Sequence, residues 1–133
     1  SCDKNIRSAE LFKIYMTIKG FSVTEHQISE GGENIVKKSY IANNGKFMIM
    51  FYETVSLDDA KMGFSVFKNE TIAKYDVEKA VVKNNTTPHS DRYTLLVDGH
   101  YILISRTDNT FMFSDSLDIY KDDLIKIAKN LGY

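Results

Sequence analysis

Apolar and polar residues alternate most regularly between residues 92 and 114, and this pattern predicts three short antiparallel strands. Asp98-Gly99 and Asp108-Asn109 separate the three runs, and both pairs are typical of tight two-residue turns. Such a turn determines which residues face each other. The predicted pairs are Val97 with His100, Leu95 with Ile102, Tyr93 with Ile104, Asp91 with Arg106, Phe113 with Ile104, and Phe111 with Arg106. One face of this meander is therefore apolar, and it carries Tyr93, Leu95, Val97, Ile102, Ile104, Phe111 and Phe113.

The N-terminal part of the chain changes from helical spacing to strand alternation. Apolar residues recur at helical spacing after Ser8, a favourable N-cap, as far as Gly20, a favourable helix stop. Further on, Asn43-Asn44-Gly45 is typical of a hairpin turn. The predicted elements are a helix at residues 8–20, a strand at 21–29, a turn at 30–34, and hairpin strands at 35–42 and 46–55. The predicted hairpin pairs are Ala42 with Phe47, Tyr40 with Ile49, and Lys38 with Phe51.

The middle and the end of the chain contain two more helical patterns. Ser56 is followed by acidic residues and by apolar residues on one face, which predicts a helix that ends near Lys74. Residues 77–82 fit either a short strand or a continued helix, and the β-branched pair Val81-Val82 favours the strand. The remaining predicted elements are a loop at residues 83–90 and a last helix that is capped by residues 115–118 and ends at Gly132.

Strand runs joined by tight turns, with helices at their edges, predict an α+β fold. We expect an antiparallel sheet of about six to seven strands with three helices packed on it, in one domain over residues 8–133. Residues 1–7 are polar and predicted to be a tether. A weak internal similarity links NGKFMIM to DGHYILI and the helix ends KGF and LGY to each other. An old duplication and shared turn chemistry both explain this similarity.

Composition excludes several classes of function. The chain has 133 residues, of which 43% are hydrophobic and 26% charged, the usual balance of one globular domain. A net charge of −1 is unlike the basic surface that a nucleic-acid-binding protein needs. The single cysteine, Cys2, excludes an internal disulfide and a zinc site built from cysteines.

None of the motifs indicates an enzyme, a cofactor or a metal site. The three histidines, His26, His89 and His100, have no acid or second histidine at metal-ligand spacing, which favours structural or exposed roles. The paired acids Asp58-Asp59 and Asp122-Asp123 lie in predicted helix first turns, where carboxylates stabilise the helix dipole. Gly31-Gly32 lacks the context of a phosphate-binding loop, and no activated serine or cysteine nucleophile is evident.

A second sheet face is the candidate binding surface. Apolar and aromatic residues of the hairpin and the meander are predicted to share this face, opposite the main core. They are Ile41, Met48, Met50, Tyr52, Leu96, Tyr101, Leu103 and Met112. A helix or a bend of the sheet would cover such a face in a soluble monomer, whereas an open face would form a ligand groove or a dimer interface.

Ser1-Cys2 and the polar residues that follow are typical of a lipoprotein cleaved at its lipobox, where the cysteine sulfur receives a diacylglycerol. Three segments, SAELFKIYMTIKGFSV, FYETVSLDDAKMGF and HYILISRTDNTFMFSDSLDIYKDDLIKIAKNLGY, resemble small lipoproteins of Firmicutes such as clostridia, across most of the chain. The resemblance implies an extracytoplasmic domain tethered to the cell membrane, and it provides no catalytic residues.

Two hypotheses follow from these observations. In the first, the chain is a lipid-anchored, non-enzymatic binding or interaction domain with an unknown protein or small-molecule partner, held at the membrane through Cys2. In the second, it is a small cytosolic domain that forms a homodimer through the second sheet face. Metabolic lipid labelling distinguishes the first hypothesis, and light scattering distinguishes the second.

Overall fold

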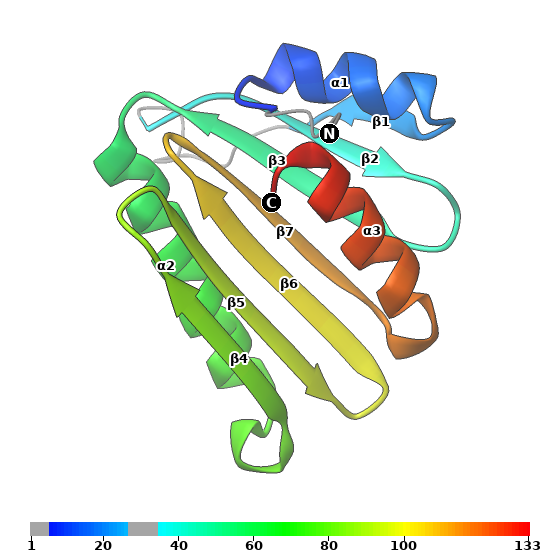
Figure 1. The fold of residues 1–133 in the computed structure, drawn as a ribbon, viewed down its shortest axis with the longest axis vertical. Coiled ribbons are helices and arrows are strands. Elements are labelled where there is room, and N and C mark those ends of the chain that lie inside the picture. Colours follow the sequence, from blue (N-terminus) through cyan, green and yellow to red (C-terminus); the bar gives the residue numbers. More distant parts are fainter. Residues whose placement is uncertain (1–5, 27–34) are drawn as a thin grey trace.

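Within the residues that the computed structural model describes, 6–26 and 35–133, seven antiparallel strands form one sheet. The strands are β1 (Ser22–Glu25), β2 (Val36–Asn43), β3 (Met48–Thr54), β4 (Val81–Thr86), β5 (Ser90–Val97), β6 (His100–Thr107) and β7 (Thr110–Leu117). Their order across the sheet is β1-β2-β3-β7-β6-β5-β4. The last strand of the chain therefore lies in the middle of the sheet (Figure 1).

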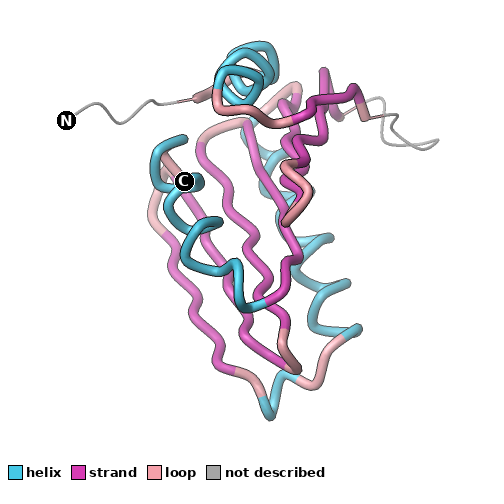
Figure 2. Tube along the Cα trace, turned by 90° about the vertical axis from the view of Figure 1, so that its right-hand side faces the viewer, coloured by secondary structure: helices cyan, strands magenta, loops and turns pink. Residues whose placement is uncertain are grey.

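Helices cover both faces of this sheet. They are α1 (Ala9–Ile18), α2 (Leu57–Lys74) and α3 (Lys121–Leu131), with short 3-10 helices η1 (Val77–Lys79) and η2 (Asp118–Tyr120). Residues of α1 and α3 pack on one face and residues of α2 on the other. Figure 2 shows α2 and α3 on opposite sides of the strands. The predicted α+β fold, an antiparallel sheet of six to seven strands with three helices, is confirmed.

Two of the helices begin where the sequence predicts, because serine side chains cap them. Ser8 Oγ accepts a hydrogen bond from the Leu11 N–H at 3.2 Å, and Ser56 Oγ accepts one from the Asp59 N–H at 3.1 Å. Such caps satisfy backbone donors that the first helical turn leaves unpaired. The third helix starts later than predicted, because β7 continues to Leu117 and η2 follows it.

The meander has the predicted register throughout. Tyr93 pairs with Ile104, Asp91 with Arg106, and Phe113 with Ile104, as do the other predicted partners. Asp98 and Asp108 have positive φ values of 49° and 51°, which the tight turns require and which aspartate tolerates better than most residues. The apolar face that these pairs define is packed against α2.

The predicted register of the β2–β3 hairpin is wrong by two residues. Ala42 pairs with Ile49 and Tyr40 with Phe51. The side-chain oxygen of Asn44 accepts hydrogen bonds from the N–H groups of Lys46 and Phe47, both at 2.9 Å, so Asn44 precedes the turn instead of forming its centre. Gly45, with φ of 84°, takes the left-handed position next to Lys46. A shift of two residues leaves every side chain on its predicted face. The same shift places Lys38 opposite Glu53, and a bulge between Val36 and Lys38 then interrupts the regular pairing.

The predicted loop at residues 83–90 is also wrong, because most of it is strand. Residues 83–86 continue β4 and pair with residues 91–94 of β5. Every side chain of this edge strand is exposed, so a polar sequence is compatible with backbone pairing there. Val77–Lys79 is a 3-10 helix, whereas Val81 and Val82 are in β4, as the β-branched pair predicted. The prediction for residues 27–34, including Gly31-Gly32, lies outside the described residues.

The packed body starts before the predicted boundary at Ser8. Ile6 is buried, its N–H donates to the Leu131 carbonyl at 3.2 Å, and its own carbonyl accepts from the Tyr133 hydroxyl at 2.6 Å. The Arg7 guanidinium lies 3.5 Å from the Asp108 carboxylate. These contacts attach the segment before α1 to the C-terminal end of the chain and to the β6–β7 turn.

Each side of β7 has the same order of elements. A helix and three strands, α1-β1-β2-β3, stand on one side, and α2-β4-β5-β6 stand on the other. The first helix packs on one face and the second on the opposite face. In this arrangement β3 corresponds to β6, as the similarity of NGKFMIM to DGHYILI predicts, but α1 corresponds to α2, whereas the similar helix ends KGF and LGY belong to α1 and α3.

Candidate functional site

The eight residues predicted to form one binding face belong to two different faces. Pairing between β3 and β7 places Met50 opposite Phe113 and Tyr52 opposite Phe111, on the α2 side. Strand alternation puts Ile41 and Met48 on that side too, whereas Leu96, Tyr101, Leu103 and Met112 are on the side of α1 and α3. The prediction of a single face is therefore wrong. No turn links β3 to β7, so the local sequence does not determine how their faces align.

Residues on the α1 and α3 side are mostly part of the core. Leu103 and Met112 are fully buried, and Tyr101 retains 6% exposure. They pack with Phe12, Phe51 and residues of α3 in one cluster. Leu96 is half-buried at the margin of this cluster. Leu103 and Met112 are therefore covered inside the monomer, whereas Leu96 and Tyr101 reach a small pocket beside β4.

On the opposite face, α2 leaves a concave surface beside β2 and β3, which we call the α2 groove. Its volume is about 410 Å³. Its floor consists of Met50, Tyr52 and Phe111, and its α2 wall consists of Met62, Val66 and Phe67. His26 and Glu70 add the polar side chains of the lining. Two of the predicted binding residues, Met50 and Tyr52, therefore lie in one apolar groove with residues of α2 that the sequence did not indicate.

Close packing of α2 on the sheet shapes this groove. Gly63 faces Phe111 so closely that a Cβ atom at position 63 would overlap the Phe111 ring. The Phe111 ring stacks on Tyr52 with centroids 4.7 Å apart, and Phe67 packs against both rings at 5.6 and 5.5 Å. Aromatic contacts at these distances add to the stabilisation from burial. The floor is consequently closely packed on its α2 side.

Tyr52 provides the polar group of the groove floor. Burial, with a smaller contribution from the negative charge of Glu70, raises the pKa of Tyr52 to about 12. Its hydroxyl is therefore protonated at neutral pH, and it donates to the Met50 sulfur at 3.4 Å. Thioether sulfur is a weak acceptor. A ligand oxygen or nitrogen would be a better partner for this hydroxyl.

A polar cluster lies at the C-terminal end of α2. His100 Nδ1 is 2.8 Å from Asp115 Oδ1, and the Tyr75 hydroxyl donates to Asp115 Oδ2 at 2.5 Å. Lys74 Nζ approaches the same carboxylate at 3.9 Å. Burial, followed by the hydrogen bond to Asp115, raises the pKa of Tyr75 to about 12. The sequence did not indicate Asp115 as the partner of His100, because the two residues are diagonal neighbours on adjacent strands.

A carboxylate that orients a histidine is an arrangement that general bases use. Among the described residues, however, Asp115 is the hydrogen-bonding partner of His100, and no serine, threonine or cysteine side chain contacts the ring through a hydrogen bond. The Tyr75 ring packs beside it at 5.6 Å. The cluster therefore links the end of α2 to β6 and β7, which is a structural function.

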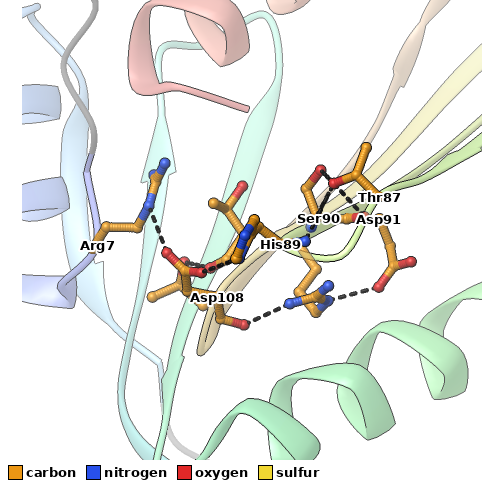
Figure 3. A network of polar contacts seen from close by, with 9 residues as sticks. Arg7, Thr87, His89, Ser90, Asp91 and Asp108 are labelled. Carbon is orange, nitrogen blue, oxygen red and sulfur yellow. Dashed lines mark hydrogen bonds and ion pairs between the residues drawn. The ribbon is translucent and has the colours of Figure 1, made fainter.

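Another polar network joins the β4–β5 turn and the β6–β7 turn to the segment before α1 (Figure 3). Arg106 Nε donates to Asp91 Oδ2 at 2.6 Å, and Arg106 Nη1 donates to the Asp108 carbonyl at 2.8 Å. The Asp108 carboxylate in turn approaches Arg7 and His89, at 3.5 and 4.0 Å. The predicted Asp91–Arg106 pair is confirmed, and its guanidinium is fully buried.

The described residues contain no group of three or more His, Cys, Asp or Glu side chains arranged to hold a metal ion. Asp58-Asp59 and Asp122-Asp123 lie in the first turns of α2 and α3, as predicted. In the same part of the chain, no helix combines the length and apolar character needed to cross a membrane. Comparison with protein-family models, curated proteins and solved structures gives no match.

Proposed function

We propose that this chain is a non-enzymatic binding domain whose α2 groove holds a small molecule with an apolar body. The observation that carries the proposal is the composition of the groove, in which methionine, valine and aromatic side chains surround one weakly bonded hydroxyl, that of Tyr52. Its volume of about 410 Å³ falls within the range of small-molecule sites. Methionine adapts to irregular apolar shapes, and both Met50 and Met62 line this space.

A neutral fluorescent probe, N-phenyl-1-naphthylamine, tests the groove directly. We expect saturable binding at one site, detected as an increase in fluorescence. Val66→Arg places a charge at the groove wall, and it should weaken binding about tenfold or more because the ligand body is apolar. Ile14→Arg is the matched control, because Ile14 on α1 is 54% exposed and Val66 is 49% exposed. Absence of saturable binding, or equal loss in both variants, would contradict the proposal.

We also propose that the domain is held at the extracytoplasmic face of the cell membrane by a lipid on Cys2. The small residue Ser1 before Cys2, the polar residues after it, and the similarity to small lipoproteins support this anchor. Two acyl chains on one cysteine are enough for stable attachment of a small domain. Labelling of the full-length protein in its host with a radioactive or clickable fatty acid should give a signal that Cys2→Ala removes. A membrane fraction without label would refute the anchor.

A homodimer through the predicted second face is the alternative. Four of its eight residues, Tyr52, Tyr101, Leu103 and Met112, are buried within the monomer. We therefore expect light scattering to give the mass of a monomer at all concentrations. The alternative result is a mass that doubles as the concentration rises and that returns to the monomer value in Val66→Arg. This result would show that a second copy of the chain binds in the α2 groove.

A further inference from the structure

A second cavity lies on the other flank of α2, between this helix and the β4–β5 hairpin. Its volume is about 360 Å³. Lys61, Ser65 and Lys68 line it from α2, and Asp91 and Arg106 line it from the sheet. We call it the Arg106 pocket. The α2 groove is lined by Met62, Val66 and Phe67 on the opposite flank of the helix, and the two sites share no residue.

The charge of this pocket is strongly positive for a chain whose net charge is −1. Lys61, Lys68 and Arg106 bring three cationic side chains to the lining, against the single carboxylate of Asp91. That carboxylate is already bonded to Arg106 Nε. Among the described residues, neither Lys61 nor Lys68 forms an ion pair. An excess of positive charge in a concave site attracts anions.

Helical spacing brings Lys61 and Lys68 to the same pocket. Lys61 and Lys68 are two turns apart on α2, with Ser65 between them, so the three side chains lie on the same flank. Lys68 Nζ lies 5.1 Å from the centroid of the Tyr93 ring in the adjacent strand. This cation–π contact keeps the ammonium group near the sheet.

Arg106 leaves one donor without a partner. Its side chain has 0% exposure, and Nε and Nη1 bond to Asp91 and to the Asp108 carbonyl. Nη2 is buried and has no hydrogen-bond acceptor among the described residues. A buried guanidinium N–H without an acceptor is costly, and Arg106 is one of the residues that line the pocket. An oxyanion oxygen is the preferred acceptor for such a donor.

We propose that the Arg106 pocket binds a tetrahedral oxyanion of the phosphate type, either free phosphate or a phosphate ester. Lys61 and Lys68 contact the outer oxygens, Ser65 is placed between the two lysines as a hydroxyl donor, and Arg106 Nη2 donates to the innermost oxygen. The dianionic charge of phosphate balances the excess of the three cations over Asp91. Asp91 binds Arg106 and so orients the guanidinium for this contact.

Calorimetric titration of the full chain with inorganic phosphate at low ionic strength tests this site. We expect one binding event in the wild type and at least about tenfold weaker binding in Lys61→Gln/Lys68→Gln, because each ammonium contributes an attraction that salt screens little at low ionic strength. Lys126→Gln/Lys129→Gln on α3 is the control with the same change of charge, and it should bind within about twofold of wild type. The NMR signal of the Arg106 Nε–H group should shift on addition of phosphate in the wild type and in the control.

The source of the phosphate group is distinguished by two further ligands. Glycerol phosphate that competes with inorganic phosphate identifies a soluble ester or ion. Binding to vesicles that contain phosphatidic acid, and not to phosphatidylcholine vesicles, identifies a lipid headgroup, provided that Lys61→Gln/Lys68→Gln abolishes it. Absence of binding to all these probes, an unchanged Arg106 signal, or equal losses in the two double variants would overturn the proposal. Loss of dye binding at the α2 groove has no bearing on these outcomes.

Discussion

Substituting Gly63 with alanine tests how closely α2 is packed on the sheet. A Cβ atom at this position would be 3.2 Å from Phe111 Cδ1 and closer still to Cε1 and Cζ. The ring cannot move away easily, because Tyr52 stacks on it at 4.7 Å and Phe67 packs against it at 5.6 Å. Overpacking of this kind costs about 1–3 kcal/mol. Alanine also favours the helix over glycine by about 1 kcal/mol, which opposes that cost.

We therefore expect Gly63→Ala to lower the free energy of unfolding by up to about 2 kcal/mol, although it improves helix propensity. Urea unfolding monitored by circular dichroism measures this change. Asn69→Ala on the exposed side of the same helix is the control, and it should be neutral or slightly stabilising. The double variant Gly63→Ala/Phe111→Leu should lose less than the sum of the two single variants, because the smaller side chain leaves space for the new methyl group. A Gly63→Ala variant more stable than wild type would refute the close packing.

Two other substitutions test buried polar groups. Tyr52 has a pKa of about 12 in the folded state against about 10 in the unfolded state, so it ionises first in the unfolded chain. Its contribution to stability is complete below about pH 10 and is lost as the pH rises through about 12. Tyr52→Phe should reduce this alkaline loss of stability by about 2–3 kcal/mol, measured by urea unfolding at a series of pH values. An unchanged pH dependence in Tyr52→Phe would contradict the raised pKa. Asp91→Ala leaves the Arg106 guanidinium buried without a carboxylate, and should destabilise the fold by about 3–5 kcal/mol in the same assay. Replacing both residues, as Asp91→Leu/Arg106→Met, should recover most of this loss, and a single variant that costs less than about 1 kcal/mol would exclude a strong pair.

Local signals predicted the parts of the fold that local physics determines. The turns at Asp98-Gly99 and Asp108-Asn109 are two residues long, so the whole register of the meander follows from them. The caps at Ser8 and Ser56 likewise require only a few neighbouring residues. The β2–β3 hairpin shows the limit of this reasoning, because the Asn44 side chain moved the centre of the turn by one residue and changed every pair.

Relations between distant segments were not predictable in this way. The alignment of β3 with β7 decides which residues share a face, and nothing between Met50 and Phe113 in the sequence determines it. The predicted face was therefore divided between the two sides of the sheet: Met50 and Tyr52 line the α2 groove, whereas Leu103 and Met112 are core residues. The sequence prediction missed the α2 wall of the groove. A signal for this wall was present, because apolar residues such as Met62 and Val66 also occur outside the predicted apolar face of α2.

The central position of β7 has a consequence for how the chain is completed during synthesis. Before Thr110–Leu117 leaves the ribosome, β3 and β6 are two open strand edges, and each belongs to a three-stranded unit with its own helix. Their union depends on the last strand, which pairs with both. Open edges are sites of misassociation between nascent chains. The same geometry makes the β6–β7 turn a natural place to divide the protein into two fragments that reassemble, with the C-terminal strand and α3 added as a separate peptide.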